Sequence, residues 1–215
     1  MKYPNLKEEK KLWKKGFKVV VGLDEAGRGS LAGPVVAAAV SIISNFKFQI
    51  AKFKKLKDSK KLAPKERKKF YNLILRDPNI EWGIGKVSEK IIDRINIFQA
   101  AKLAMKRAVK NLNRKLEIAN FKKIDFLILD GNFKLDLPIP QKSIVKGDEK
   151  VLSCALASIL AKVTRDRIME KYAKRFPKYG FEKHKGYATK FHLKMLKKYG
   201  PCKIHRKSFL PVAKI

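Results

Sequence analysis

Near the N-terminus, an apolar run ends abruptly in two adjacent carboxylates, and this junction constrains the fold more than any other segment. The run Val19–Leu23 is rich in β-branched residues, and Asp24–Gly29 (DEAGRG) follows it directly. A short apolar run without polar alternation predicts a strand buried on both faces, as in a sheet covered by helices. The sequence therefore predicts a strand whose end carries acidic side chains beside a glycine-rich loop.

Strand-like and helix-like segments alternate along the rest of the chain, which is typical of the α/β class. We expect strands at Lys18–Leu23, Pro34–Ile43, Glu81–Val87, Phe126–Leu129 and Ser143–Val145. We expect helices at Pro64–Leu75, Ile92–Leu116, Glu149–Arg175 and near Thr189–Lys198. Because little sequence separates the first two strands, they predict a meander joined to later parallel strands, and thus a mixed sheet covered by helices. Small residues would let one helix lie close on that sheet: Ala155, Ala157, Ser158 and Ala161.

The chain is strongly basic, with 52 Lys and Arg against 19 Asp and Glu and a formal net charge of +33. A field of this sign attracts polyanions, of which nucleic acid is the commonest. A general bias towards Lys, or thermal adaptation, explains much of the excess equally well, because Lys outnumbers Arg and is spread along the chain. The 45% hydrophobic content excludes a disordered basic tail.

The two cysteines, Cys154 and Cys202, have no metal-like spacing and imply no disulfide framework. Free thiols favour a reducing compartment, so we expect a cytoplasmic protein. Residues 1–18 lack the apolar core of a signal peptide, and no apolar stretch approaches the roughly 20 residues that span a bilayer. We therefore expect no membrane partner.

Four carboxylates share one kind of position, at or just past the end of a strand-like run: Asp24, Glu25, Asp130 and Asp148. In open α/β sheets, ligands bind beyond the carboxyl ends of the strands, and neighbouring strands are about 5 Å apart. Clustered carboxylates repel one another unless a cation lies between them. Oxygen ligands without Cys or His select a hard ion, so we predict a Mg²⁺ or Mn²⁺ site. Two such ions about 4 Å apart would activate a water and stabilise the leaving oxygen of a phosphodiester.

Each acidic residue also has a simpler interpretation. Asp148 precedes a helix and is compatible with an N-cap. Asp130 begins a common turn pair with Gly131. Asp24 and Glu25 are compatible with solvated loop charges, and they share one site only if the chain bends at Glu25, because adjacent strand residues point to opposite faces. The combination, rather than any one residue, favours the metal site.

The loop Gly27–Gly29 (GRG) lacks the spacing of dinucleotide and Walker A loops. Glycines let backbone amide and carbonyl groups approach a ligand closely, and such a pair is suited to detecting a ribose 2′-hydroxyl. A plain turn with a surface Arg remains the alternative.

Two other segments are candidates for substrate contact. The segment Asp58–Lys61 is compatible with phosphate binding or with a plain loop before a helix. Tyr187 offers a ring face for stacking on a sugar or base, or is an ordinary half-buried tyrosine. The three histidines show no carboxylate partner in the sequence, and we assign none of them to catalysis: His184, His192 and His205.

Taken together, these and further segments resemble one family, bacterial ribonuclease HII. The matching stretches are Gly22–Gly29, Asp58–Leu62, Asp130–Asn132, Lys146–Asp148, Ala157–Asp166, Phe176–Phe181, His184–Tyr187 and His205–Phe209. They follow the family's order over nearly the whole chain. The resemblance implies a ribonuclease H-like, mixed five-stranded sheet flanked by helices. It also implies a single domain over residues 1–215, with a core at about 17–175 and a helical C-terminal extension at about 176–215.

The resemblance further implies an endoribonuclease that cleaves the RNA strand of RNA–DNA hybrids. Such an enzyme also nicks 5′ to ribonucleotides embedded in duplex DNA, leaving 3′-hydroxyl and 5′-phosphate ends, and serves ribonucleotide removal from DNA. With Mn²⁺ or Mg²⁺ as cofactor, the family's catalytic and metal-binding carboxylates match Asp24, Glu25, Asp130 and Asp148. Its 2′-hydroxyl-sensing motif matches Gly27, Arg28 and Gly29, and its junction-reading tyrosine matches Tyr187. We expect further substrate contacts from Ser59, Lys60, Lys61 and Arg165.

Arg28 and the short segment before the first strand fit this type better than ribonuclease HIII, which usually lacks the Arg and adds an N-terminal domain. Two departures are small: Ala63 stands where a capping Ser or Thr often precedes the helix, and Ala188 where the family often has Pro. We expect a monomer, and sliding-clamp association stays open because no clamp-binding peptide is evident. The competing hypothesis is a non-catalytic basic nucleic-acid-binding protein, which accounts for the charge but not for the strand-end carboxylates.

Overall fold

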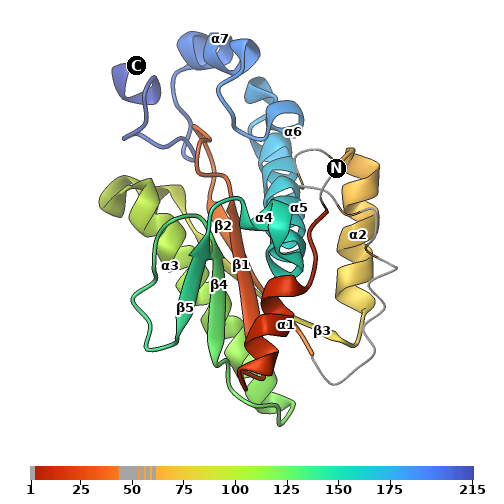
Figure 1. The fold of residues 1–215 in the computed structure, drawn as a ribbon. Coiled ribbons are helices and arrows are strands. Elements are labelled where there is room, and N and C mark those ends of the chain that lie inside the picture. Colours follow the sequence, from red (N-terminus) through yellow and green to blue (C-terminus); the bar gives the residue numbers. More distant parts are fainter. Residues whose placement is uncertain (1–2, 44–52, 54–55, 57–58, 60–61) are drawn as a thin grey trace.

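A five-stranded mixed sheet lies at the centre of a computed structural model that describes residues 3–43, 53, 56, 59 and 62–215 (Figure 1). Its strands are β1 (Val20–Ala26), β2 (Val35–Ile42), β3 (Ile80–Val87), β4 (Phe126–Asp130) and β5 (Gln141–Ile144). Their order across the sheet is β3-β2-β1-β4-β5. The strands β1, β2 and β3 form an antiparallel meander, whereas β4 and β5 run parallel to β1, so the predicted mixed sheet is confirmed.

The central strand β1 extends further at its C-terminal end than the sequence predicts. Asp24 pairs with Ala38 and Glu25 with Ala37, so both carboxylates belong to the strand ladder and not to the following loop. Hydrogen bonding to β2 on one side and to β4 on the other fixes this strand. The acidic end of β1 is therefore part of the sheet, paired with β2 beyond the point where pairing with β4 ends at Leu23.

Helices cover both faces of the sheet (Figure 1). They are α1 (Lys7–Lys14), α2 (Pro64–Arg76), α3 (Glu89–Ile118), α4 (Gly147–Lys150), α5 (Leu152–Arg175), α6 (Phe181–His184) and α7 (Lys190–Tyr199), with 3-10 turns at η2 (Pro177–Tyr179) and η3 (Val212–Lys214). The helix α3 lies on one face, and α5 lies on the other together with α1 and α2. The four predicted helical regions are confirmed, with two interruptions: α3 has a non-helical residue at Asn96, and an extended Val151 separates α4 from α5. The helices α1 and α6 were not expected from the sequence.

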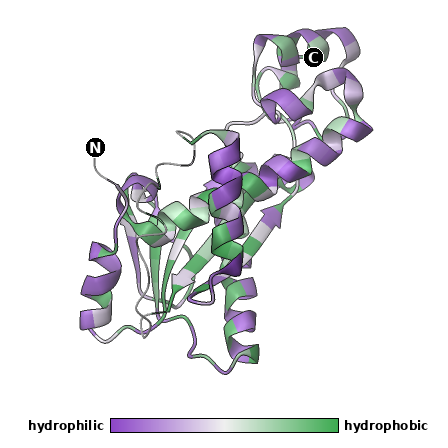
Figure 2. Ribbon diagram, turned by 90° about the vertical axis from the view of Figure 1, so that its right-hand side faces the viewer, coloured by the Kyte–Doolittle hydropathy of each residue, from purple (hydrophilic) through white to green (hydrophobic). Residues whose placement is uncertain are grey.

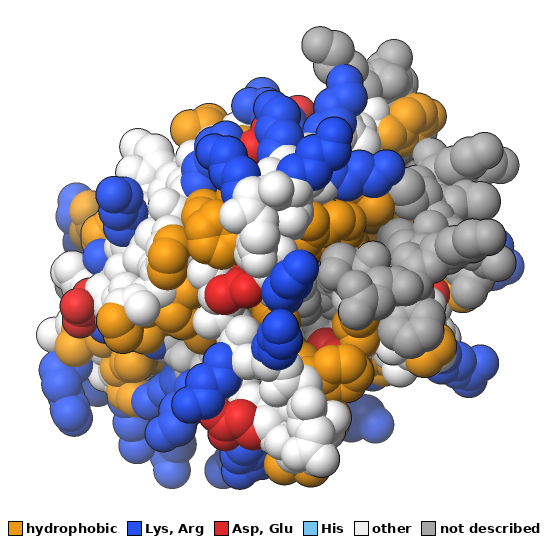
Figure 3. Space-filling model, turned by 60° about the horizontal axis from the view of Figure 1, so that its bottom comes forward, with side chains coloured by type: hydrophobic (Ala, Val, Ile, Leu, Met, Phe, Trp, Pro, Cys, Tyr) orange, Lys and Arg blue, Asp and Glu red, His pale blue; other side chains and the backbone are white. Residues whose placement is uncertain are grey.

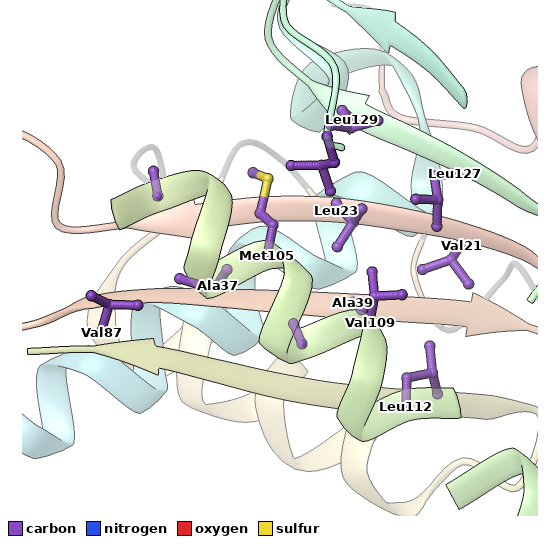
Figure 4. Close-up of a cluster of buried hydrophobic side chains, with 14 of the residues drawn as sticks. Val21, Leu23, Ala37, Ala39, Val87, Met105, Val109, Leu112, Leu127 and Leu129 are labelled. Atoms are coloured by element: carbon purple, nitrogen blue, oxygen red, sulfur yellow. The ribbon is translucent and has the colours of Figure 1, made fainter. Parts of the chain in front are cut away.

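The core between α3 and the sheet depends on close backbone contact. Met105, Val109 and Leu112 of α3 point towards buried side chains of the strands (Figure 4). A Cβ atom at Gly85 of β3 would lie 1.9 Å from the carbonyl oxygen of Ala104 in α3. The helix therefore rests directly on the backbone of β3, which only glycine permits.

The opposite face uses small residues in the same way. The four small residues singled out on α5 are all buried, as predicted: Ala155, Ala157, Ser158 and Ala161. A Cβ atom at Gly22 of β1 would lie 2.4 Å from the backbone carbonyl carbon of Ser153. This contact sets α5 beside the end of β1, where the acidic residues lie.

The C-terminal helices pack on the loop between β1 and β2. Backbone bonds join Gly33 to Ile204 and Leu31 to Gly186, both with a length of 2.8 Å. Phe181 and Leu196 centre a small apolar cluster there, although most residues of these helices are hydrophilic (Figure 2). The loop after β1 is thus held between the sheet and the C-terminal segment.

The positive charge is distributed widely over the surface. On the face shown in Figure 3, Lys and Arg side chains lie over several elements, with few Asp and Glu among them. This spread agrees with the diffuse Lys enrichment of the sequence and does not by itself mark a binding face. Among the described residues, none of the helices has the length and apolar character needed to cross a membrane.

Candidate active site

A groove of about 580 Å³ opens at the C-terminal ends of β1 and β4. It is lined by residues of β1, the loop after it, β4, α2, α5 and the segment before α7: Asp24, Glu25, Ala26, Gly27, Arg28, Gly29, Ser59, Arg67, Asp130, Ser158, Lys162 and Tyr187. Most of the residues singled out in the sequence lie here. The predicted substrate contacts Lys60 and Lys61 lie outside the described residues.

Three of the four predicted carboxylates converge. Asp24, Asp130 and Asp148 each offer one oxygen, and these oxygens lie within 4.8 Å of one another. Asp24 is near the end of β1 and Asp130 ends β4, and because these strands are adjacent and parallel, their carboxyl ends meet at one edge of the sheet. The short helix α4, which follows β5, adds Asp148 to the same place.

Burial and electrostatic repulsion together disfavour negative charge in this carboxylate group. The pKa of Asp24 is raised well above its usual range, first because the side chain is buried and then because Glu25, Asp130 and Asp148 place like charges near it. Backbone N–H groups orient two of the carboxylates: that of Glu25 donates to Asp24 Oδ1 at 2.6 Å and that of Gly147 to Asp130 Oδ1 at 2.8 Å. Converging oxygen donors with unrelieved repulsion fit a hard divalent cation.

Glu25 lies close enough to Asp24 for its negative charge to be the first of the like charges that raise the pKa of Asp24. The strand β1 stays paired through Ala26, and both side chains line the groove without a bend at Glu25. The Oε1 atom of Glu25 lies 3.2 Å from Nη1 of Arg28. Glu25 lines the groove but does not belong to the close group of three oxygens.

The simpler interpretations of the carboxylates are only partly correct. Asp148 is buried inside α4, and Val151 is the N-cap of α5, so the N-cap interpretation of Asp148 is wrong. Asp130 belongs to β4, and a turn does follow it, with Gly131 at a φ of +128°. The turn thus ends the strand where its last carboxylate enters the groove.

In the loop Gly27–Gly29, the two glycines are not equivalent. Gly27 has a φ of +98°, and a Cβ atom there would lie 2.1 Å from Nε of Arg165. At Gly29, a Cβ atom would meet no other atom within 4 Å. The requirement for glycine in this structure therefore lies at Gly27, which must adopt a left-handed conformation against a buried arginine.

Arg165 has no exposed atom with which to touch a substrate. Its side chain is completely buried, and its guanidinium donates to three backbone carbonyl oxygens, those of Pro34, Lys185 and Ala32, at 2.9 to 3.0 Å. This arrangement contradicts a direct substrate contact in the present conformation. Arg165 instead ties the loop after β1 to the segment that carries Tyr187.

Two other predicted residues lie in the groove. Ser59 is buried, and its Oγ atom is 2.8 Å from that of Ser158. Tyr187 is 39% exposed, and its ring centroid lies 5.9 Å from Nζ of Lys162. Tyr187 therefore presents a free aromatic surface beside cationic groups.

Three polar residues of the groove were not assigned as site residues from the sequence: Arg67, Ser158 and Lys162. Arg67 fixes the approach to the groove, because its Nε donates to the carbonyl oxygen of Ser59 at 2.7 Å. Ser158 and Lys162 are four residues apart on α5, a spacing that puts both on one face of a helix. That spacing was a usable signal, whereas nothing distinguishes Arg67 from the other basic residues of its helix.

Strand-end carboxylates in a groove with basic side chains, on a mixed sheet of this order, define a metal-dependent nuclease of the ribonuclease H class. The family model for ribonuclease HII matches residues 21–212, and the chain belongs to this family, which confirms the resemblance. Ribonuclease HII of Chlamydia caviae is 47% identical over 209 residues, which cover 96% of this chain and 91% of that protein. Ribonuclease HII of Acetivibrio thermocellus is 51% identical over 201 residues, covering 94% of this chain and 73% of that protein.

Solved structures agree on the fold. The crystal structure of ribonuclease H2 from Pyrococcus horikoshii superposes with a TM-score of 0.68 at 26% identity, covering 91% of this chain and 96% of that one. A structure of Bst ribonuclease HIII in complex with Mn²⁺ gives a TM-score of 0.71 at 19% identity, covering 91% and 68%. The ribonuclease HII of Archaeoglobus fulgidus, solved as a complex with PCNA, gives 0.66 at 24% identity, covering 89% and 95%.

Proposed function

We propose that this protein is an endonuclease that cleaves the RNA strand of RNA–DNA hybrids and nicks duplex DNA 5′ to an embedded ribonucleotide. The products would carry 3′-hydroxyl and 5′-phosphate ends. The observation that carries this proposal is the convergence of Asp24, Asp130 and Asp148 in the groove that also contains the Gly27–Gly29 loop and Tyr187. One place thus holds groups suited to hydrolysis beside groups suited to recognising a sugar.

The carboxylates would hold two divalent ions, Mg²⁺ or Mn²⁺. When bound, such a pair activates a water and stabilises the leaving oxygen of the phosphodiester. Asp24, Glu25 and Asp130 would carry the ions, and Asp148 would ligate or position the second ion and help product release. The Mn²⁺ complex of a related fold supports the choice of ion. Glu25 lines the same groove, and its Oε1 lies 3.2 Å from Nη1 of Arg28.

Basic side chains would position the phosphate. Lys162 lines the groove and lies on α5, with its Nζ 2.7 Å from Asp166 Oδ1. Arg67 lies at the same groove and supports Ser59 through a backbone carbonyl. These cations would offset the negative charge of a nucleic-acid backbone close to the carboxylates.

Recognition of the ribose would come from the backbone of Gly27–Gly29, which reads the 2′-hydroxyl. Tyr187, with its ring partly exposed, would pack against the adjacent deoxyribose. Together these groups would restrict cutting to a ribonucleotide–deoxyribonucleotide junction. Such specificity would serve removal of ribonucleotides from DNA.

Several organisational features follow from the same proposal. We propose that the chain is a single domain, since backbone bonds link Leu31 and Gly33 of the β1–β2 loop to the C-terminal segment. Both cysteines are free, which suits a protein that works in the reducing cytoplasm. We propose that it acts as a monomer on duplex nucleic acid, and a PCNA-bound relative of the same fold makes clamp association worth testing.

The decisive experiment incubates the purified protein with a labelled duplex that carries one ribonucleotide, with and without Mg²⁺ or Mn²⁺. We expect a single metal-dependent nick on the 5′ side of the ribonucleotide, and cleavage within a longer RNA–DNA hybrid. An all-DNA duplex of the same sequence should stay intact. Binding without any metal-dependent nick would instead support a non-catalytic nucleic-acid-binding protein, and cutting of the all-DNA control would indicate a nuclease that does not read the sugar.

A further inference from the structure

Arg206, in the C-terminal segment, donates hydrogen bonds from all three nitrogens of its guanidinium to the loop after β1. Its side chain is completely buried. The Nη2 atom donates to the carbonyl oxygen of Gly27 at 2.7 Å, Nη1 to that of Arg28 at 2.9 Å, and Nε to that of Gly33 at 3.0 Å. One side chain thus fixes two successive peptide groups of Gly27–Gly29. It also fixes Gly33, where the longer loop between β1 and β2 ends.

The burial of this charge is costly. Among the described residues, no carboxylate oxygen forms an ion pair with Arg206. Burial, and then the nearby positive charge of Arg165, lowers the pKa of Arg206 to about 9. A buried cation without a carboxylate in contact is a poor source of stability compared with an apolar side chain. What an arginine supplies here is a rigid fork of donors that can hold several carbonyl groups in a fixed relation.

Because the peptide bond is planar, fixing the direction of a carbonyl group also fixes the direction of the N–H group in the same peptide. In a trans peptide, the carbonyl oxygen and the following N–H point in opposite directions. Because the oxygens of Gly27 and Arg28 point to the buried guanidinium, the N–H groups of Arg28 and Gly29 point away from it. Neither N–H donates to another backbone group in the described part of the chain, and both residues line the groove.

We propose that Arg206 is a positioning residue for substrate discrimination. It holds the two peptide groups so that the N–H groups of Arg28 and Gly29 face the groove together. There they donate hydrogen bonds to an oxygen of the sugar-phosphate unit beside the cleaved bond. This inference rests on the proposed function of the groove. It changes the expected contact in one respect: the carbonyl oxygens of Gly27 and Arg28 point to the buried Arg206, so the N–H sides of these two peptide groups, and not the carbonyl sides, face the ligand.

The test compares Arg206→Met, which keeps much of the side-chain length, with Arg206→Lys, which keeps the charge but not the fork. A matched control is Leu112→Ala, which removes a fully buried side chain between α3 and the sheet without touching the loop. Each protein is assayed for thermal unfolding, duplex affinity, single-turnover cleavage rate and the position of the cut on a duplex with one ribonucleotide and on a hybrid with several.

For Arg206→Met we expect the single-turnover rate to fall about 10- to 100-fold while duplex affinity changes less than about threefold, because a shifted loop misplaces the sugar without removing binding charge. The cuts in the longer hybrid should spread over several phosphates. Arg206→Lys should lie between Arg206→Met and the wild type. Added guanidinium ion should restore part of the rate to an Arg206→Ala variant, which a merely structural role would not predict.

The outcomes separate the two proposals. If the wild type makes no metal-dependent nick, the function proposed for the groove fails. If the wild type nicks, but the folded Arg206 variants resemble Leu112→Ala in rate per folded molecule and in cut position, the positioning role of Arg206 is overturned. Should Arg206→Met not fold, the Lys variant decides by the same two readouts: unchanged rate and cut position contradict the inference.

Discussion

The Nε2 atoms of His192 and His205 lie 3.0 Å apart, and their other ring nitrogens settle which of the two donates. His192 Nδ1 is 2.9 Å from the carbonyl oxygen of Tyr187, which can only accept, so His192 carries its proton on Nδ1. The backbone N–H of Cys202 donates to His205 Nδ1 at 2.9 Å, so His205 carries its proton on Nε2. A directed chain of neutral rings therefore runs from Cys202 to the backbone of Tyr187.

This chain predicts that the protein loses stability in mild acid. Burial lowers the pKa of His192 and of His205 to about 4 from an ordinary value of 6.5. Between these values the unfolded chain binds more protons than the folded one, so stability falls as the pH drops through this window and is fully present above it. A further proton on His192 would place its Nε2–H against the Nε2–H of His205, and a further proton on His205 would place its Nδ1–H against the N–H of Cys202.

Chemical denaturation as a function of pH measures this effect. The pH dependence of the unfolding free energy between about pH 6.5 and pH 4 should weaken in a His205→Gln variant, which cannot titrate in that range. His184→Gln serves as a comparison, because burial also lowers the pKa of His184 but its ring bonds to Tyr179 and Gly186 instead. An identical pH dependence in wild type and His205→Gln would contradict the neutral chain.

The histidine chain also illustrates what the sequence leaves hidden. No carboxylate partner for the three histidines was visible in the sequence, and we assigned them no catalytic role; the structure explains the first point, because their partners are backbone groups and one another. Strands and long helices were predictable because each carries its own apolar pattern. Partners brought together by tertiary packing carry no such local pattern.

The carboxylate site likewise has features that were predictable from a local pattern and features that depend on tertiary packing. The ends of β1 and β4 were predictable because apolar runs stop at Asp24 and Asp130. Tertiary packing decides the rest: Asp148 of α4 joins Asp24 and Asp130 in the close group of oxygens, whereas Glu25, the neighbour of Asp24 in the sequence, lines the groove outside that group, and no local pattern encodes this difference. The burial of Arg165 was likewise unforeseeable, since its three partners are carbonyl oxygens of distant loops.

Replacing Asp24 by Asn should abolish cleavage while leaving duplex binding nearly unchanged. Removal of this carboxylate takes away one of the three converging oxygens proposed to hold the metal, and we expect the rate to fall by at least about 100-fold. Calorimetric titration with Mn²⁺ should show weaker binding. Without metal, the same variant should unfold at a higher temperature than the wild type, because the raised pKa of Asp24 reflects burial and repulsion that the amide avoids.

The matched control for Asp24→Asn is Asp136→Asn, which makes the same charge change at a side chain that is 97% exposed and forms an ion pair with Lys106. It should leave cleavage, Mn²⁺ affinity and the unfolding temperature close to those of the wild type. Cleavage at the wild-type rate by Asp24→Asn would exclude the proposed mechanism. A lower unfolding temperature of that variant in chelator would show that Asp24 is not under repulsive strain.

Substitution of Gly27 by Ala should destabilise the loop, whereas Gly29→Ala should not. Gly27 has a φ of +98° and would place its Cβ 2.1 Å from Nε of Arg165. We expect a loss of about 1–3 kcal/mol in the free energy of unfolding for Gly27→Ala, from backbone strain and displacement of a buried arginine. Gly29 has neither constraint, so denaturant titration should find Gly29→Ala close to the wild type. Equal losses at both positions would refute the distinction.

Glu9 of α1 should stabilise the protein through its acceptor oxygen and not through its charge. This helix was not predicted, and Glu9 anchors it: Oε1 accepts from the backbone N–H of Ser153 at 2.9 Å and from its hydroxyl at 2.8 Å. Burial raises the pKa of Glu9 above 4.5, so the folded chain holds its proton more tightly and stability falls as pH rises through that window.

Glu9→Ala leaves a buried N–H of α5 unsatisfied, at a cost of about 1–3 kcal/mol. Glu9→Gln keeps an acceptor and should lose less, and its unfolding free energy should no longer carry this pH dependence. An equal loss in both variants, measured by denaturant titration near neutral pH, would show that the charge is what matters.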